Sequence, residues 1–203
     1  IKKINKEFLA KYKVVFWDFD GVIKDSVSLK TEGFRKLFSK YGTQVTKRVV
    51  KHHVENGGVS RYKKIPFYFK EYVGKEINSE QASFYANEFS KLVINEVIRS
   101  PWIDGVKKYL INNKYNQDFI IVTGTPLEEI NIILERLEIK NIFKAIHGSP
   151  EEKSDAVSTV IKKFNFIKSD LVLIGDSITD YEAAISNNID FILRVKSSDK
   201  NVN

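Results

Sequence analysis

Short apolar runs that end in acidic, glycine or other polar residues recur along this chain of 203 residues. The clearest is VVFWDF at residues 14–19, and similar runs occupy residues 119–123, 171–175 and 191–195. A run of this length that leads into polar residues is typical of a buried β-strand followed by a loop. The pattern therefore predicts four strands over these residues.

Between the last three runs, apolar residues return at helical spacing. They predict helices over residues 126–137, 153–164 and 178–187. Strands that alternate with helices favour a parallel sheet that is covered on both faces. The predicted fold class is therefore α/β, with a Rossmann-like, doubly wound parallel sheet.

Residues 25–100 break this alternation and show helical patterns alone, with predicted helices over residues 27–41 and 79–98. Aromatic and apolar residues recur at helical spacing in both: Phe34, Phe38 and Tyr41 in the first helix, and Phe84 or Tyr85, Phe89 and Leu92 in the second. This period favours a separate small hydrophobic core over the stacking of aromatic rings on nucleic acid bases. We therefore predict a core domain of residues 1–24 and 101–203 that carries an inserted helical cap at residues 25–100.

The net charge of the chain is +7, and the whole excess of positive charge lies within residues 24–100. A basic surface attracts nucleic acids, lipids or anionic metabolites. The charge count does not choose among these partners. Because no nucleic-acid motif accompanies the charge, we expect no nucleic acid and keep a nucleic-acid binder as a rival. No apolar stretch approaches the roughly 18 residues that span a bilayer, and the first residues are too polar for a signal peptide, so no membrane partner and a cytoplasmic location are expected.

Polar residues follow the predicted strands where their carboxyl ends meet. In a doubly wound sheet these ends converge on one crevice, so the residues there face a ligand. They are Asp18, Asp20 and Gly21 after the first strand, Thr123 and Gly124 after the second, Gly175, Asp176 and Asp180 after the next, and Lys153 at the start of a helix. Phosphoryl transfer needs a nucleophile, a counter-cation, hydrogen bonds to the phosphate and a general acid, and this set offers all four.

These motifs resemble those of the haloacid dehalogenase-like hydrolase superfamily. The matching residues are Asp18-Phe19-Asp20-Gly21-Val22, then Thr123, Lys153 and Gly175-Asp176-Ser177-Ile178-Thr179-Asp180. The resemblance covers the whole chain, because such enzymes carry a cap between the first two motifs. It implies a phosphatase or a phosphomutase, since members with other chemistry lack an acid at the position of Asp20.

The resemblance also assigns roles. Asp18 would attack phosphorus, and Asp20 would protonate the leaving oxygen and later activate water. Thr123, Gly124 and Lys153 would hold the phosphate, with Ser177 and Asp180 as supporting residues. Mg²⁺ would be bound by Asp18, Asp176 and the backbone carbonyl of Asp20.

The local context of Thr123 and Lys153 supports these roles. Thr125 to Glu128 read as a helix capping box, with Thr125 as the cap, which leaves Thr123 free for phosphate. Lys153 lies near the start of its helix, where a cation is unfavourable unless an anion is close. Zinc is not expected, because His52 and His53 are adjacent and would point apart on a helix, and the chain has no cysteine.

Within the cap, Gly57-Gly58 can form a tight turn, with Arg61 just beyond it. We expect this turn and Arg61 to contact the part of the substrate that carries no phosphate; a solvated helix face is the alternative. The predicted activity is Mg²⁺-dependent hydrolysis of a small phosphorylated metabolite through an aspartyl-phosphate. The rivals are a phosphomutase of the β-phosphoglucomutase type and a phospho-accepting receiver domain without turnover.

Overall fold

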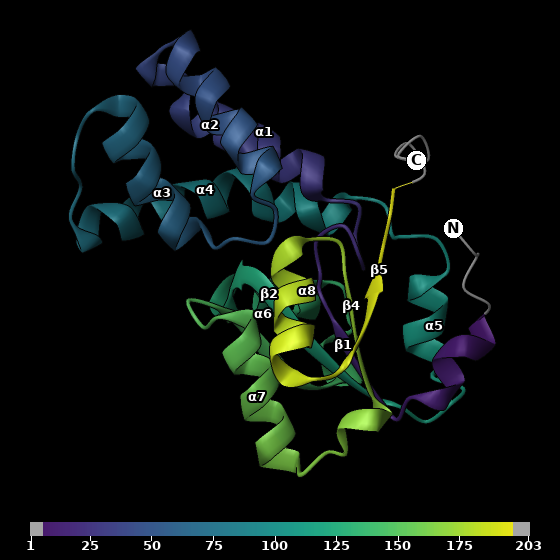
Figure 1. Ribbon diagram of the computed structural model, residues 1–203. Coiled ribbons are helices and arrows are strands. Elements are labelled where there is room, and N and C mark those ends of the chain that lie inside the picture. Colours follow the sequence, from purple (N-terminus) through teal and green to yellow (C-terminus); the bar gives the residue numbers. More distant parts are fainter. Residues whose placement is uncertain (1–5, 197–203) are drawn as a thin grey trace, which may run out of the picture.

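The computed structural model describes residues 6–196, which form a parallel sheet flanked by helices and a separate group of helices (Figure 1). The sheet has the strand order β3-β2-β1-β4-β5, and all of its neighbouring strands are parallel. The strands are β1 (Val14–Trp17), β2 (Asp118–Pro126), β3 (Phe143–Ser149), β4 (Leu171–Gly175) and β5 (Asp190–Leu193). The Rossmann-like α/β fold class is thereby confirmed.

The α-helices fall into two groups in Figure 1. Around the sheet lie α5 (Val106–Asn112), α6 (Leu127–Arg136), α7 (Lys153–Phe164) and α8 (Ile178–Asn187). Apart from the sheet lie α1 (Val27–Phe38), α2 (Thr43–Glu55), α3 (Arg61–Tyr68) and α4 (Ser79–Arg99). Short 3-10 turns occupy Lys6–Lys11, Ser39–Tyr41, Lys140–Ile142 and Lys168–Asp170, and a π-helical turn spans Phe69–Val73.

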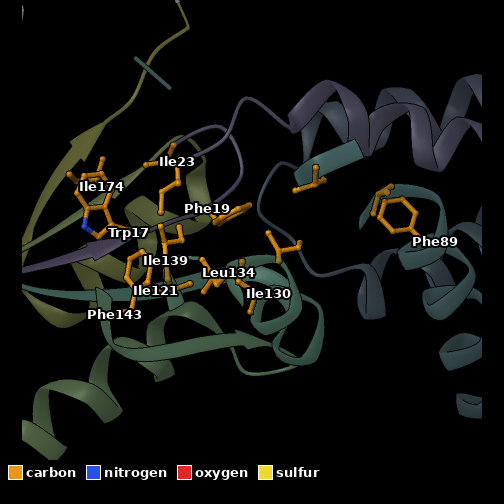
Figure 2. Packing of buried hydrophobic residues seen from close by; sticks show 14 of the residues in the cluster. Trp17, Phe19, Ile23, Phe89, Ile121, Ile130, Leu134, Ile139, Phe143 and Ile174 are labelled. Carbon is orange, nitrogen blue, oxygen red and sulfur yellow. The ribbon is translucent and has the colours of Figure 1, made fainter. Parts of the chain in front are cut away.

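The alternation of side chains along β1 builds a core on each face of the sheet. Val15 and Trp17 pack into one apolar cluster, and Val14 and Phe16 into the other. All four are buried, as a strand covered on both faces requires. Figure 2 shows part of the first cluster, with Trp17 beside the sheet and Phe89 of α4 set apart among the cap helices.

Two elements do not follow from the apolar runs. The edge strand β3 has the sequence FKAIHGS, whose middle residues are only partly buried, so it lacks the continuous apolar run of the other strands. Helix α5 is short and buries Leu110 alone. Packing beside the sheet therefore stabilises β3 and α5 more than a strong local sequence pattern does.

The separate helices share an aromatic core, as their periodicity predicts. Phe34 and Phe89 lie with ring centroids 4.3 Å apart, and both are buried together with Phe38. On the long helix α4, Tyr85 rather than Phe84 packs on the expected face, and the prediction for Leu92 is wrong, because Leu92 is exposed. Its buried face is formed by Ala82, Ala86, Phe89, Val93 and Val97.

Within residues 6–196, no helix is both long and apolar enough to cross a membrane.

Candidate active site

Asp18 lies directly after β1 and is almost fully buried. Its backbone N–H donates to the carbonyl of Ile174 on β4, and its Oδ1 accepts a hydrogen bond of 2.7 Å from the backbone of Phe19. The chain then turns at Gly21, which has a φ of +77°. A Cβ at Gly21 would overlap Oδ2 of Asp176, so a glycine here lets the acids of two strand ends approach each other.

Three carboxylates and one lysine form the centre of the site. Carboxylate oxygens of Asp18, Asp176 and Asp180 lie within 4.8 Å of one another. The ammonium group of Lys153 lies 3.1 Å from Asp18 Oδ2 and 2.5 Å from Asp180 Oδ1. The start of α7 therefore places its lysine against anions, which is what its unfavourable position in the helix predicts.

One lysine does not offset the negative charge of three carboxylates, and the pKa values of Asp18 and Asp176 reflect this excess of negative charge. Burial raises the pKa of Asp18 to about 8, and the charges of Asp180, Asp176 and Asp20 add to the effect against Lys153. Burial and the charge of Asp180 likewise raise the pKa of Asp176 to about 6. The cluster is therefore short of positive charge, which a bound cation would supply.

Asp20 has a different environment from Asp18. Its Oδ1 accepts a hydrogen bond of 2.6 Å from Ser26, and its Oδ2 accepts one of 2.9 Å from Thr125 and another from the ammonium of Lys30. Burial alone would raise the pKa of Asp20, but the charge of Lys30 and these hydrogen bonds outweigh it and lower the pKa. The two neighbouring acids thus have opposite pKa shifts, as expected for groups with different tasks.

The capping box predicted at Thr125 is wrong. Strand β2 continues to Pro126, and α6 begins at Leu127 without a side-chain cap. The Thr125 hydroxyl donates to Asp20 and accepts a hydrogen bond of 2.5 Å from Lys30. Thr125 and Lys30 are therefore site residues that sequence reasoning missed, because Thr125 satisfies a local helix signal and Lys30 belongs to no motif.

The Gly57-Gly58 turn lies against the core. A Cβ at Gly58, which has a φ of +78°, would overlap the hydroxyl of Thr179, and a Cβ at Gly124 would overlap the carbonyl oxygen of Gly58. Glycines on both sides thus allow direct contact of the cap turn with the end of β2 and the start of α8. The structure represents a closed arrangement.

Arg61 lies close to the site, but its charge is already balanced. Its guanidinium makes two hydrogen bonds to Glu129 on α6, of 2.6 and 2.8 Å, and one of 2.8 Å to Ser90 on α4. Both charged side chains are buried. Arg61 thus joins the cap helices to the core; its expected contact with substrate stays a prediction.

A cavity of about 460 Å³ brings most of these residues together, a volume suited to a small molecule. It is lined by Asp18, Asp20, Thr123, Gly124, Asp176 and Ser177 from the predicted core set, and by Gly57, Gly58 and Arg61 from the predicted cap set. Lys153 and Asp180 are not among its lining residues and lie buried behind Asp18. The residues predicted from distant motifs therefore meet in one place.

The donor set suits a hard divalent cation such as Mg²⁺, which prefers carboxylate oxygens and water. The acids that converge are Asp18, Asp176 and Asp180, whereas the carboxylate of Asp20 faces Ser26, Lys30 and Thr125. Asp180 also binds Lys153 and accepts a hydrogen bond of 2.5 Å from the Ser177 hydroxyl. These bonds are consistent with the supporting role expected of Asp180 and Ser177.

Comparison with known proteins gives the same assignment. The sequence model of the haloacid dehalogenase-like hydrolases matches residues 15–194. The chain belongs to this family. The resemblance to this family that the motifs indicate is thereby confirmed, and so is the enzyme class, a haloacid dehalogenase-like phosphatase.

A protein of Thermotoga maritima named phosphorylated carbohydrates phosphatase is 24% identical over 196 residues, which cover 92% of this chain and 86% of that protein. Two solved structures share the fold. A predicted phosphoglycolate phosphatase from Haemophilus somnus aligns with a TM-score of 0.69 and 18% identity over 90% of this chain and 85% of its own. A haloacid dehalogenase-like family protein from Streptococcus pneumoniae aligns with a TM-score of 0.65 and 16% identity over 90% and 84%.

Proposed function

We propose that this haloacid dehalogenase-like phosphatase hydrolyses a small phosphorylated carbohydrate or a related metabolite, with Mg²⁺ and through an aspartyl-phosphate at Asp18. The observation that carries the proposal is the convergence of Asp18, Asp176, Asp180 and Lys153 at a cavity that Asp20 also lines. The name of the Thermotoga maritima relative supports the substrate class.

In the proposed first step, a carboxylate oxygen of Asp18 attacks phosphorus, and the bond from phosphorus to the leaving oxygen breaks. Asp20 gives a proton to that oxygen, so the product leaves as an alcohol. The backbone N–H of Phe19, bonded to Asp18 Oδ1, and the ammonium of Lys153 near Oδ2 would hold the nucleophile in one orientation.

In the proposed second step, water attacks phosphorus and the bond to Asp18 breaks, which releases phosphate. Asp20 accepts the proton of this water. The environment of Asp20 supports this second role only, because Lys30, Ser26 and Thr125 favour the ionised form, which accepts a proton, whereas the first step starts from the protonated form.

The excess of negative charge at Asp18, Asp176 and Asp180 fits a divalent cation, and Asp18 and Asp176, with Asp180 behind them, would hold it. When bound, Mg²⁺ would reduce the repulsion between an anionic nucleophile and an anionic phosphate. Thr123 and Gly124 line the same cavity and would contact the phosphate, while the turn at Gly58 would keep bulk water out.

The direct test is turnover of a panel of phosphorylated sugars and sugar acids, measured as released phosphate with Mg²⁺ and with a chelator. We expect release that requires the metal. An isomerised sugar phosphate without free phosphate would instead identify a phosphomutase. Phosphorylation of the protein by a small phosphodonor, with no turnover of any compound, would identify a receiver-like protein and contradict the proposal.

A further inference from the structure

The cations around the cavity differ in what balances their charge. Lys153 faces Asp18 and Asp180, Arg61 faces Glu129, and Lys30 faces Asp20. Lys64 of α3 also lines the cavity and is only 2% exposed. Among residues 6–196, it forms no ion pair with a carboxylate, and its ammonium group instead lies 3.0 Å from Nδ1 of His53.

His53 does not supply the missing negative charge. Burial lowers its pKa to about 3, and the charges of Lys64 and Lys30 act in the same direction, so the imidazole is neutral near pH 7. Its ring packs against Phe34 with centroids 4.6 Å apart. Burial and the charge of Lys30 also lower the pKa of Lys64, to about 7. The cap wall of the cavity thus contains a buried lysine that lacks an acidic partner, and an anion beside it would stabilise its charged form.

We propose that Lys64, with its ammonium group oriented by His53, binds a second anionic group of the substrate, a carboxylate or a second phosphate. This inference rests on the proposed function, because it assumes that the phosphate to be cleaved lies beside Asp18 in the same cavity. It narrows the substrate to small phosphomonoesters that carry another negative charge. Lys64 then performs the specificity role that the sequence assigned to Arg61, whose own charge is balanced by Glu129.

The geometry supports one bound molecule that contacts both ends. Asp18, Asp20, Lys30, His53 and Lys64 all line one cavity. Lys30 lies near both the proposed catalytic residues and Lys64, because it forms an ion pair with Asp20 and its charge also lowers the pKa of Lys64. An anion beside Lys64 would restore the balance of charge that the other cations already have.

The test compares matched substrates in wild-type protein and in Lys64→Met. One set carries a second anion (2-phosphoglycolate, 3-phosphopropionate and propane-1,3-diol bisphosphate), and the other lacks it (ethyl and propyl phosphate). We expect Lys64→Met to lower kcat/KM for the anionic set by roughly 30-fold or more, and to leave the values for the alkyl phosphates within about threefold. A loss confined to the carboxylates or to the bisphosphate would identify which anion is bound.

Lys47→Met is the control, since it removes a positive charge from an exposed position of α2 outside the cavity. Lys64→Gln, a neutral variant that can still hydrogen bond to His53, repeats the test should the methionine variant fold poorly. Equal losses for both substrate sets in the Lys64 variants, or no loss, would overturn the subsite. Wild-type protein that hydrolyses both sets equally well would overturn the subsite alone, whereas wild-type protein inactive on both sets and on the panel of phosphorylated sugars would also refute the proposed function.

Discussion

The two walls of the cavity have opposite charge imbalances. On the wall from the sheet, Asp18 and Asp176 line the cavity, and Asp180 and a single lysine, Lys153, lie buried behind them. The wall from the cap contains Lys64, which has no carboxylate partner among the described residues. The sheet wall is short of positive charge, and by our proposal the cap wall binds an anion. A substrate with a metal-bound phosphate at one end and a second anion at the other would satisfy both.

The walls also differ in how their residues are positioned. The acids of the sheet wall follow the ends of β1 and β4, where hydrogen bonds between strands fix the backbone. The cap residues lie on helices that touch the core through the Gly58 turn and the pair of Arg61 and Glu129. The proposed catalytic acids thus follow from the sheet, and we propose that the residues on the cap helices select the substrate.

The largest effect is expected at the sheet wall. Asp18→Asn removes the proposed nucleophile and should lower kcat by roughly 10³-fold or more on every substrate. The variant should keep its fold, because it replaces a buried carboxylate whose charge is disfavoured there. Steady-state kinetics and circular dichroism check both points, and Asp155→Asn, an exposed acid in the first turn of α7, serves as the control. Full activity in Asp18→Asn would refute the assignment.

The next largest effect is expected on stability, at the buried ion pair of Arg61 and Glu129 that joins the two walls. Arg61→Met leaves Glu129 buried without its partner and should lower the free energy of unfolding by about 3 kcal/mol or more. Lys63→Met is a matched control, because Lys63 pairs with Glu152 on the surface and its loss should cost less than about 1 kcal/mol. Urea titration of both variants provides the comparison. Equal losses would mean that the buried pair contributes no more than an exposed one.

A smaller effect concerns closure of the cap. A Cβ at Gly124 would overlap the carbonyl oxygen of Gly58, so Gly124→Ala should force the walls apart and lower kcat/KM by roughly 10-fold to 100-fold. At Gly57 a Cβ would meet only the Cβ of Ser177, at 3.7 Å, so Gly57→Ala should lower kcat/KM far less than Gly124→Ala does. Similar kinetics for the two variants would argue against a closed state in turnover.

The smallest effect is the link between pH and Mg²⁺. The folded pKa values of Asp18 and Asp176, about 8 and about 6, lie above those of an unfolded chain. Without metal these two carboxyl groups make the folded protein bind more protons than the unfolded one, which lowers its stability as the pH rises from 5 to 8.5, whereas the lowered pKa values of His53 and Lys64 act in the opposite direction.

A bound cation removes that loss. Mg²⁺ should consequently raise the melting temperature more at pH 8.5 than at pH 5, and thermal unfolding with and without a chelator measures the difference. The pH dependence should shrink in Asp18→Asn. An equal increase at both pH values would show that these two carboxyl groups do not bind the metal.

Much of the sheet wall could be predicted from the sequence. The buried strands are continuous apolar runs, and the acids that follow them converge because parallel strands end at one edge. The edge strand β3 could not be predicted in this way, because its residues are only partly apolar. The predicted starts of α7 and α8 are confirmed, because each has a polar entry followed by a clear apolar period.

The cap wall could not be predicted to the same depth. A lysine at helical spacing normally indicates a solvated face, and nothing local shows that Lys64 is buried. Arg61 and Glu129 lie in different helices far apart in sequence, so their pairing depends on tertiary structure alone. Thr125 was assigned to the wrong partner because its helix-cap signal is local, whereas its bonds to Asp20 and Lys30 are not.

The most direct test of the central claim is to trap the phosphoryl group. Asp20→Asn should slow the second step, because it removes the proposed base for water. Mixing this variant with Mg²⁺ and an aryl phosphate, whose leaving oxygen needs no proton from Asp20, followed by rapid acid quench and peptide mass spectrometry, should locate a phosphate on Asp18. Turnover without any phosphorylated protein, or a phosphate on another residue, would contradict the account.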